Sequence, residues 1–134
     1  MNAAQNSASV GLAAINALYN TGFLDVFSGT QPATPETALS GNTLLVSGIF
    51  SGTAFAAPAF SSGFQRSAAT FSAASYAPVA SGTAAFARAY KADHTTVIAD
   101  YTVGTAGTDI IAGSTSIATG VNVSFAMTNT MPAV

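Results

Sequence analysis

The feature that most constrains this chain is the alternation of side chains between Thr83 and Val103. In the first half, Phe86–Tyr90, large side chains share one face and alanines share the other. The second half, Val97–Val103, places its valines and Tyr101 on one face. A period of two residues indicates β-strands, because successive side chains of a strand point to opposite faces. The polar segment Lys91–His94 between the two halves predicts a turn, so the whole stretch predicts a hairpin.

One segment, Ser7–Asn20, has a helical pattern. Its predicted core stripe recurs at helical spacing and consists of Leu12, Ile15, Leu18 and Tyr19. Asn6 or Ser7 is expected to cap the start of the helix, and Gly22 is expected to end it in the left-handed conformation.

Short apolar or alternating runs between Gly-rich turns predict further strands. These runs are 23–27, 43–50, 69–76, 115–118 and 121–128, and Thr34-Pro35 predicts a single helical turn between the first two. Many short strands after one helix predict a mainly β fold, an antiparallel β-sandwich with one N-terminal α-helix. We expect a single domain over 1–134, with an arm and helix over about 1–22 and the sandwich over about 23–130.

The segment 51–67 is rich in Ala and Phe and has no clear period. We expect a long loop here, although a loop of this length is uncommon inside a compact domain. Two interpretations follow. Either its Phe55, Phe60 and Phe64 pack on a neighbouring subunit, or the segment contains a strand that the pattern does not reveal.

Charge is unusually scarce in this sequence. Only 6% of the residues are Asp, Glu, Lys or Arg, against about 25% in ordinary soluble domains. Charged residues are depleted at the cores of protein interfaces, so this composition favours a chain whose surface is largely covered by neighbours. The alternative is a small β domain that its Ser and Thr hydroxyls keep soluble.

Little in the sequence indicates chemistry at a site. Asp93 beside His94 could orient an imidazole as a general base, but no nucleophile motif accompanies the pair, so we expect no enzyme. With one His and no Cys, a zinc site is excluded, and no other cofactor motif is present. Three basic residues are too few for a nucleic-acid surface. The charge-free segment 37–65 is interrupted by polar residues, so we expect no membrane span.

The same residues supply candidates for a protein interface, because buried aromatic and Arg side chains contribute most interface energy. Arg88 lies between two aromatic residues of a predicted strand, which fits a stacked or ion-paired contact and equally fits a simple outward-facing position. The candidates are Phe55, Phe60, Phe64, Arg66, Arg88, Lys91, Asp93 and His94.

Two segments carry a resemblance to a known group of proteins. VFSGTQPATPETALSGNTLLVS (Val26–Ser47) resembles a strand, turn and small helical turn of small structural proteins of tailed bacteriophages. HTTVIADYTVGTAGTDIIAGSTSIATGVNVSF (His94–Phe125) resembles the C-terminal half of the same group. Ser51–Gly82 departs from the pattern, and the matching motifs hold no catalytic residues.

The resemblance implies a decoration or cement protein on the capsid exterior, made in the host cytoplasm before assembly. The partners that the resemblance implies for this protein are the major capsid protein and further copies of the same chain. The oligomer that we consider for these copies is a trimer. One alternative is a neck, tail or fibre-base component of the same virion. A second alternative, from another class, is a carbohydrate-binding adhesion module, which would use some of the four tyrosines for stacking.

Overall fold

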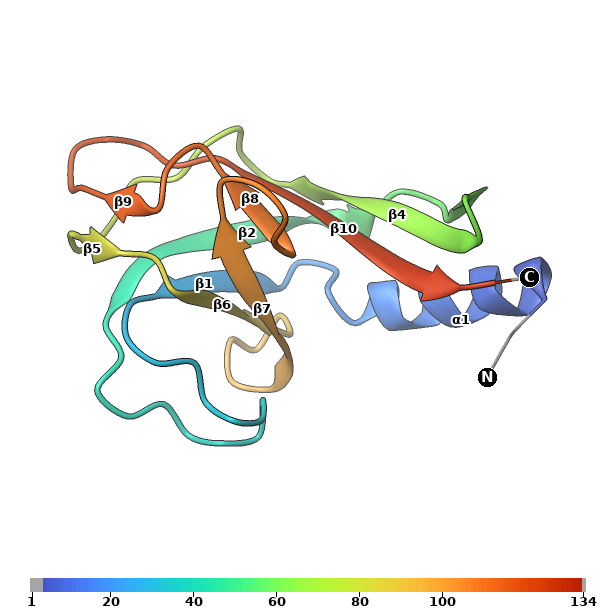
Figure 1. The fold of residues 1–134 in the computed structure, drawn as a ribbon, viewed down its shortest axis with the longest axis horizontal. Coiled ribbons are helices and arrows are strands. Elements are labelled where there is room, and N and C mark those ends of the chain that lie inside the picture. Colours follow the sequence, from blue (N-terminus) through green and yellow to red (C-terminus); the bar gives the residue numbers. More distant parts are fainter. Residues whose placement is uncertain (1–3, 134) are drawn as a thin grey trace.

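A computed structural model of the chain describes residues 4–133, and these form one α-helix and ten β-strands (Figure 1). The elements are α1 (Gln5–Ala17), β1 (Phe23–Phe27), β2 (Leu44–Phe55), β3 (Ala59–Ser61), β4 (Phe64–Phe71), β5 (Gly82–Thr83), β6 (Phe86–Tyr90), β7 (Val97–Gly104), β8 (Ile110–Ala112), β9 (Ser116–Ile117) and β10 (Phe125–Pro132). The prediction of a mainly β fold with one N-terminal helix is confirmed. Most of the arm expected before this helix lies outside the described residues.

The strands close on themselves. Seven strands pair in the order β10-β8-β7-β6-β1-β2-β4, and β4 pairs back to β10. A ring of this kind is a barrel, so the finer prediction of a sandwich of two sheets does not describe the pairing. One neighbouring pair, β7 with β8, is parallel, whereas the other pairs in the ring are antiparallel. Closure removes the exposed edges that an open sheet would leave available for unwanted pairing.

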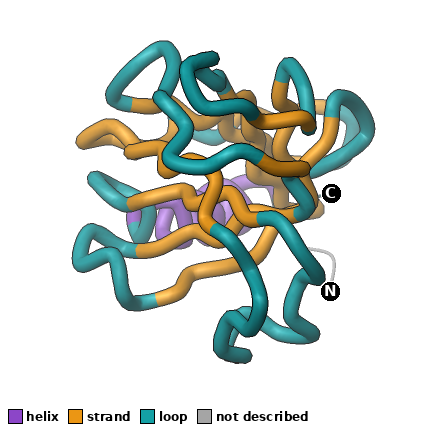
Figure 2. Tube along the Cα trace, turned by 90° about the vertical axis from the view of Figure 1, so that its left-hand side faces the viewer, coloured by secondary structure: helices purple, strands orange, loops and turns teal. Residues whose placement is uncertain are grey.

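The helix lies at one end of this barrel and packs on β2, β4 and β10. In the view from the other end, α1 appears behind the strands (Figure 2). The small two-stranded sheet of β5 and β9 lies at the end away from α1 (Figure 1). The core between these ends is built from buried apolar side chains, the largest of which include Tyr19, Phe50, Phe86, Leu24, Leu45 and Ile110.

The hairpin predicted from the alternation is present. β6 and β7 pair antiparallel, and Arg88 lies directly opposite Asp100. The connecting turn is longer than Lys91–His94, because Lys91 N–H donates to the carbonyl of Thr96. The prediction of a hairpin over 83–103 is therefore confirmed in type and position.

The helix forms, and the predicted core stripe is confirmed for Leu12 and Tyr19 but is wrong for Ile15 and Leu18. Its buried residues are Ala8, Leu12 and Asn16, with Tyr19 just beyond the helix end, whereas Ile15 and Leu18 are each 43% exposed. The predicted side-chain cap is absent, since Ala4 occupies the N-cap position. Thr21, and not Gly22, has the positive φ at the helix end. Gly22 is required for another reason, because a Cβ there would lie 2.3 Å from the carbonyl oxygen of Tyr90.

The segment 51–67 is not a long loop. β2 continues through to Phe55, and β3 and β4 follow on either side of a two-residue turn at Ser62-Gly63. Both turn residues have positive φ, as the tight hairpin turns that match strand twist require. The interpretation that a strand is concealed here is therefore correct. The pairing of β2 with β4 is irregular between Phe50 and Phe55, and this bulge breaks the alternation that would have revealed the strand.

Three smaller predictions also need correction. The last strand is β10, which begins at Phe125 and not at residue 121, and β4 ends at Phe71 and not near Tyr76. Tyr76 and Val123 instead form an isolated bridge outside the named strands. The segment after Thr34 is a hydrogen-bonded turn, from Thr37 N–H to the Thr34 carbonyl, and not a helical turn.

Candidate interaction surface

The eight predicted contact residues fall into three structural groups. Phe55 lies in the core and is 5% exposed, and Arg88 is 3% exposed, so neither can be a contact residue in this fold. Phe60, Phe64 and Arg66 lie on the β3–β4 hairpin, and the exposed residues Lys91, Asp93 and His94 lie in the β6–β7 turn. The structure therefore does not gather the eight residues into one surface.

Phe60 and Phe64 are exposed but do not form a common patch. Phe60 is opposite Gln65 in the register of β3 with β4, whereas Phe64 is opposite Ser61. Paired residues share a face and successive residues alternate, so the two rings lie on opposite faces of the hairpin. On its face, the Phe64 ring lies under the guanidinium of Arg66, with the Arg66 Cζ 5.2 Å from the ring centroid.

Arg88 forms a buried ion pair inside the molecule. Its Nε and Nη2 donate to the two carboxylate oxygens of Asp100 at 2.7 and 2.9 Å, and its Nη1 donates to the carbonyl of Thr37 at 3.0 Å. Both charged side chains are only 3% exposed. The hydrogen bonding to Asp100 is the main cause that raises the pKa of Arg88 above its ordinary value, with burial acting against it. This pair fixes the turn that contains Thr37 against the barrel wall.

Asp93 organises the β6–β7 turn and does not act on His94. Its carboxylate accepts hydrogen bonds from the Thr96 hydroxyl at 2.5 Å and from the backbone N–H groups of Thr95 and Thr96. These bonds favour the charged form, those from Thr96 most, and they hold the pKa of Asp93 well below its ordinary range.

His94 binds a different carboxylate, that of Asp25. The Nε2 of His94 lies 2.8 Å from Asp25 Oδ2, and the Ser47 hydroxyl donates to Asp25 Oδ1 at 2.5 Å. The imidazole also stacks on the Phe23 ring, with centroids 3.9 Å apart. Because Ser47 donates to Asp25 and not to His94, the trio lacks the nucleophile-to-base hydrogen bond that activates a serine. The contacts of His94 with Asp25 and Phe23 therefore hold the β6–β7 turn against β1.

A polar network that the sequence did not suggest lies between α1 and the barrel. The hydroxyls of Tyr19 and Tyr101 share a hydrogen bond, Tyr101 also reaches Asn129 at 3.5 Å, and Asn129 donates to Asn16 at 2.9 Å. Burial is the main cause that raises the pKa of both tyrosines. The tyrosines are therefore neutral under ordinary conditions, and the network joins α1, β7 and β10 without a charge.

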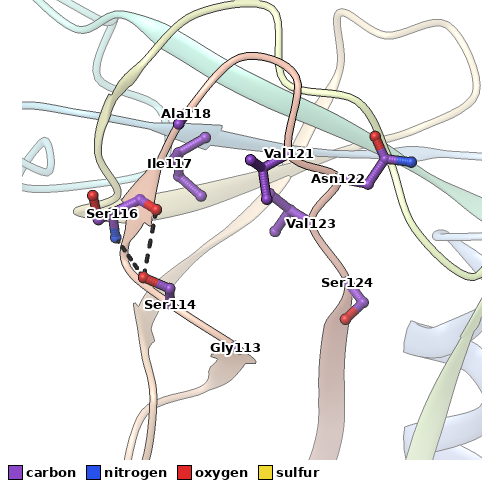
Figure 3. A pocket seen from close by; sticks show the side chains of 9 residues that line it. All are labelled: Gly113, Ser114, Ser116, Ile117, Ala118, Val121, Asn122, Val123 and Ser124. Carbon is purple, nitrogen blue, oxygen red and sulfur yellow. Dashed lines mark hydrogen bonds between the residues drawn. The ribbon is translucent and has the colours of Figure 1, made fainter.

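A surface hollow of about 500 Å³ is lined by residues of the segment 113–124, and its lining has no charged side chain (Figure 3). Ser114 and Ser116 lie on one side, where the Ser114 hydroxyl accepts from Ser116 N–H at 3.1 Å (Figure 3). Val121 lies on the other side and is 63% exposed. Hydroxyl and aliphatic groups of this kind can accommodate a neutral protein surface.

Several exposed apolar residues were missed, because Val10 and Val121 lie inside a predicted helix and a predicted strand whose patterns do not report exposure, and Val79 lies outside the predicted elements. Val10 on α1 is 66% exposed and Val79 is 67% exposed. Val79 is followed by β5, and Val121 comes shortly after β9, so these two lie in loops flanking the small sheet at the end of the barrel away from α1 (Figure 1). Exposed aliphatic residues thus occur at both ends of the barrel.

The described residues, 4–133, contain no helix that is long and apolar enough to cross a membrane. Over the same residues, His, Asp and Glu side chains do not gather into a group of three or more that could hold a metal ion. Comparison of the chain with protein-family models, with curated proteins and with solved structures finds no match. Function must therefore be argued from the residues themselves.

Proposed function

We propose that this protein is a non-enzymatic structural component of a tailed-bacteriophage virion, most specifically a cement protein that bridges and stabilises subunits of the major capsid protein. It acts on the capsid exterior after synthesis in the host cytoplasm. The resemblance of Val26–Ser47 and His94–Phe125 to small virion proteins supplies the class of protein. The composition of the exposed surface gives physical support to the proposal.

The observation that carries the proposal is the scarcity of exposed charge. The charged side chains of Asp25, Arg88 and Asp100 are buried. The exposed charged residues are Glu36, Arg66, Lys91, Asp93 and Asp109. They are spread over 6651 Å² of accessible surface, close to the roughly 6,400 Å² expected for a compact monomer of this mass.

A surface of this kind suits repeated contacts in a lattice. Neutral hydroxyl and aliphatic groups can be buried against a neighbour without the desolvation cost of a charge. Exposed apolar residues at both ends of the barrel, Val10 at one and Val79 and Val121 at the other, provide two contact regions. A protein that bridges two capsid subunits needs two such regions.

The alternatives are separated by different observations. A neck, tail or fibre-base component would have the same surface, and its copy number in the virion would distinguish it. A carbohydrate-binding module gains no support from the tyrosines, since Tyr19 is buried and Tyr76, Tyr90 and Tyr101 are half-buried. A flat, exposed aromatic platform is what such a module would use.

The proposal is tested by binding of the purified protein to capsids that lack it. We expect the protein to sediment with these capsids and to raise the temperature at which they dissociate. Val10→Asp places a charge at the α1 end of the barrel, and Val121→Asp places one at the opposite end. Each variant is the matched control for the other. At least one should weaken binding by about tenfold or more, because a charge is then desolvated in the contact. Failure of the unmodified protein to sediment with capsids would contradict the proposal.

A further inference from the structure

The outer face of β4, β10 and β8 carries exposed charges of both signs around one groove. The groove has a volume of about 300 Å³, and its lining includes Arg66, Asp109, Thr128 and Thr130. All four of these residues are exposed. Neither Arg66 nor Asp109 forms an ion pair within residues 4–133, in contrast to the internally paired Arg88.

The strand register places the two charges on opposite sides of β10. Arg66 pairs with Thr130 across the β4–β10 ladder. On the other side Ile110 pairs with Met127, so Asp109, which precedes Ile110, lies beside Thr128. Neighbouring strands are about 4.8 Å apart and residues about 3.4 Å apart along a strand, so an offset of two strands and two residues separates the backbone positions of Arg66 and Asp109 by about 12 Å. Between them the outward residues of β10 are Thr128 and Thr130, and Ile111 also lines the groove.

We propose that this face binds a second copy of the chain, with Arg66 of each copy paired with Asp109 of the other. The two charges are opposite and lie at the two ends of one groove. A two-fold axis that lies in the plane of the contact, midway between the charges and perpendicular to the line that joins them, sets each Arg66 over the other copy's Asp109. Such a contact is self-complementary, as two-fold interfaces are.

The two-fold symmetry also separates this contact from a trimer. A cyclic trimer needs two different patches, one meeting the other around a ring. On this face Arg66 and Asp109 line the same groove. Only a two-fold arrangement pairs each of them with its opposite charge in the other copy at the same time. This inference rests on the proposed function, for which the resemblance implies further copies of the chain as partners, and it names the surface of that contact. It is tested on the purified chain alone, so its failure is distinguishable from a failure to bind capsids.

The test uses charge reversal and sedimentation equilibrium. The unmodified chain should form a dimer whose dissociation constant rises with salt. Arg66→Asp and Asp109→Arg should each weaken the dimer by at least about tenfold, because like charges then face each other twice. Lys91→Asp and Glu36→Arg change the net charge by the same amounts at other exposed positions and should leave the dimer unchanged.

A mixture of the two reversal variants gives the sharpest result. The Arg66→Asp variant is acidic at both positions and the Asp109→Arg variant is basic at both, so both contacts between them join opposite charges. We therefore expect the mixture to form a heterodimer more tightly than either variant dimerises alone. Asp109 also accepts hydrogen bonds from Thr102 N–H and its hydroxyl. Asp109→Asn, which keeps an acceptor oxygen, is a milder variant and should weaken the dimer by less than reversal does.

Three outcomes would overturn the inference. The first is a chain that stays monomeric up to about 1 mM, beyond which a contact is too weak to be specific. The second is a dimer that Arg66→Asp leaves unchanged relative to Lys91→Asp, and the third is a mixture of folded reversal variants that does not associate. In the first outcome, loss of capsid binding by Arg66→Asp would assign the face to another protein.

Discussion

Two regions of the barrel differ in how they distribute their charged and aromatic residues between core and surface. The β6–β7 hairpin holds a large share of the charged residues, yet Arg88 and Asp100 neutralise each other inside the fold. The β2–β4 region holds many of the aromatic residues, and these are divided, with Phe50 and Phe55 in the core and Phe64 at the surface. In the first region the charged pair Arg88–Asp100 is buried while Lys91 and Asp93 of the turn stay exposed. In the second region an aromatic side chain, that of Phe64, is left at the surface.

The difference shows what a regular strand pattern can and cannot reveal. Along β6 and β7 the alternation is nearly unbroken, with a single register shift near Tyr90, so the faces can be assigned from the sequence. Along β2 the register shifts by several residues between Phe50 and Phe55. Thr70 maintains this bulge, because its hydroxyl donates to the carbonyl of Thr53 at 2.7 Å. Beyond such a bulge the period of two no longer reports which side a residue faces.

The largest expected effect comes from breaking the buried charge pair of the β6–β7 hairpin. Arg88→Ala leaves Asp100 buried without its partner and should lower the free energy of unfolding by about 3–5 kcal/mol, measured by urea denaturation. The double variant Arg88→Met with Asp100→Leu removes both charges and should recover most of this loss. A single variant that unfolds at the same urea concentration as the unmodified protein would show that the pair does not stabilise the hairpin.

A comparable effect should separate the two kinds of Phe in the β2–β4 region. Phe55→Ala creates a cavity beside Tyr19 and Phe50, whose rings it contacts edge-on and tilted, and should cost about 3–5 kcal/mol. Phe64→Ala is the matched control and should cost only about 0.5–1 kcal/mol, because the ring is exposed and contacts chiefly Arg66. Equal losses for both variants would contradict the division of this region into core and surface.

The smallest effect concerns the turn of the hairpin and depends on pH. Hydrogen bonds lower the pKa of Asp93 in the folded protein, so its contribution to stability is present above the unfolded pKa of about 3.9. It is lost as the pH falls below that value towards the folded pKa. Asp93→Asn should therefore be less stable than the unmodified protein at neutral pH, and the difference should shrink under acid conditions. Thermal unfolding measured at several pH values tests this, and a constant difference would exclude the carboxylate as its cause.

The sequence predicted those parts of the fold that depend on local pattern. The β6–β7 hairpin and β1 were located correctly, and the mainly β class followed from them. The buried face of α1 was predicted only in part, because Asn16 takes the place of an apolar residue there and accepts a hydrogen bond from the distant Asn129. The closure of the barrel also depends on distant contacts, since β4 and β10 are separated by much of the chain.

The candidate surface was predicted less well than the fold, for a related reason. Arg88 and His94 were expected at an interface, yet their partners are Asp100 and Asp25, and the second of these lies 69 residues away in the chain. Whether a side chain can contact a neighbouring protein depends on its partners within the fold. A partner that is distant in the chain, such as Asp25 for His94, cannot be identified from the spacing of residues in the sequence. The uncharged surface itself was predictable, because it follows from composition.

The central claim is that this charge-poor surface is buried against repeated neighbours in a virion. Quantitative mass spectrometry of purified virions, with the major capsid protein as the internal reference, tests it most directly. The claim predicts about one copy per capsid subunit or a simple fraction of that number, as a symmetric lattice requires. A ratio far below any such fraction would place the protein in the neck or tail, and its absence from the particles would contradict the claim.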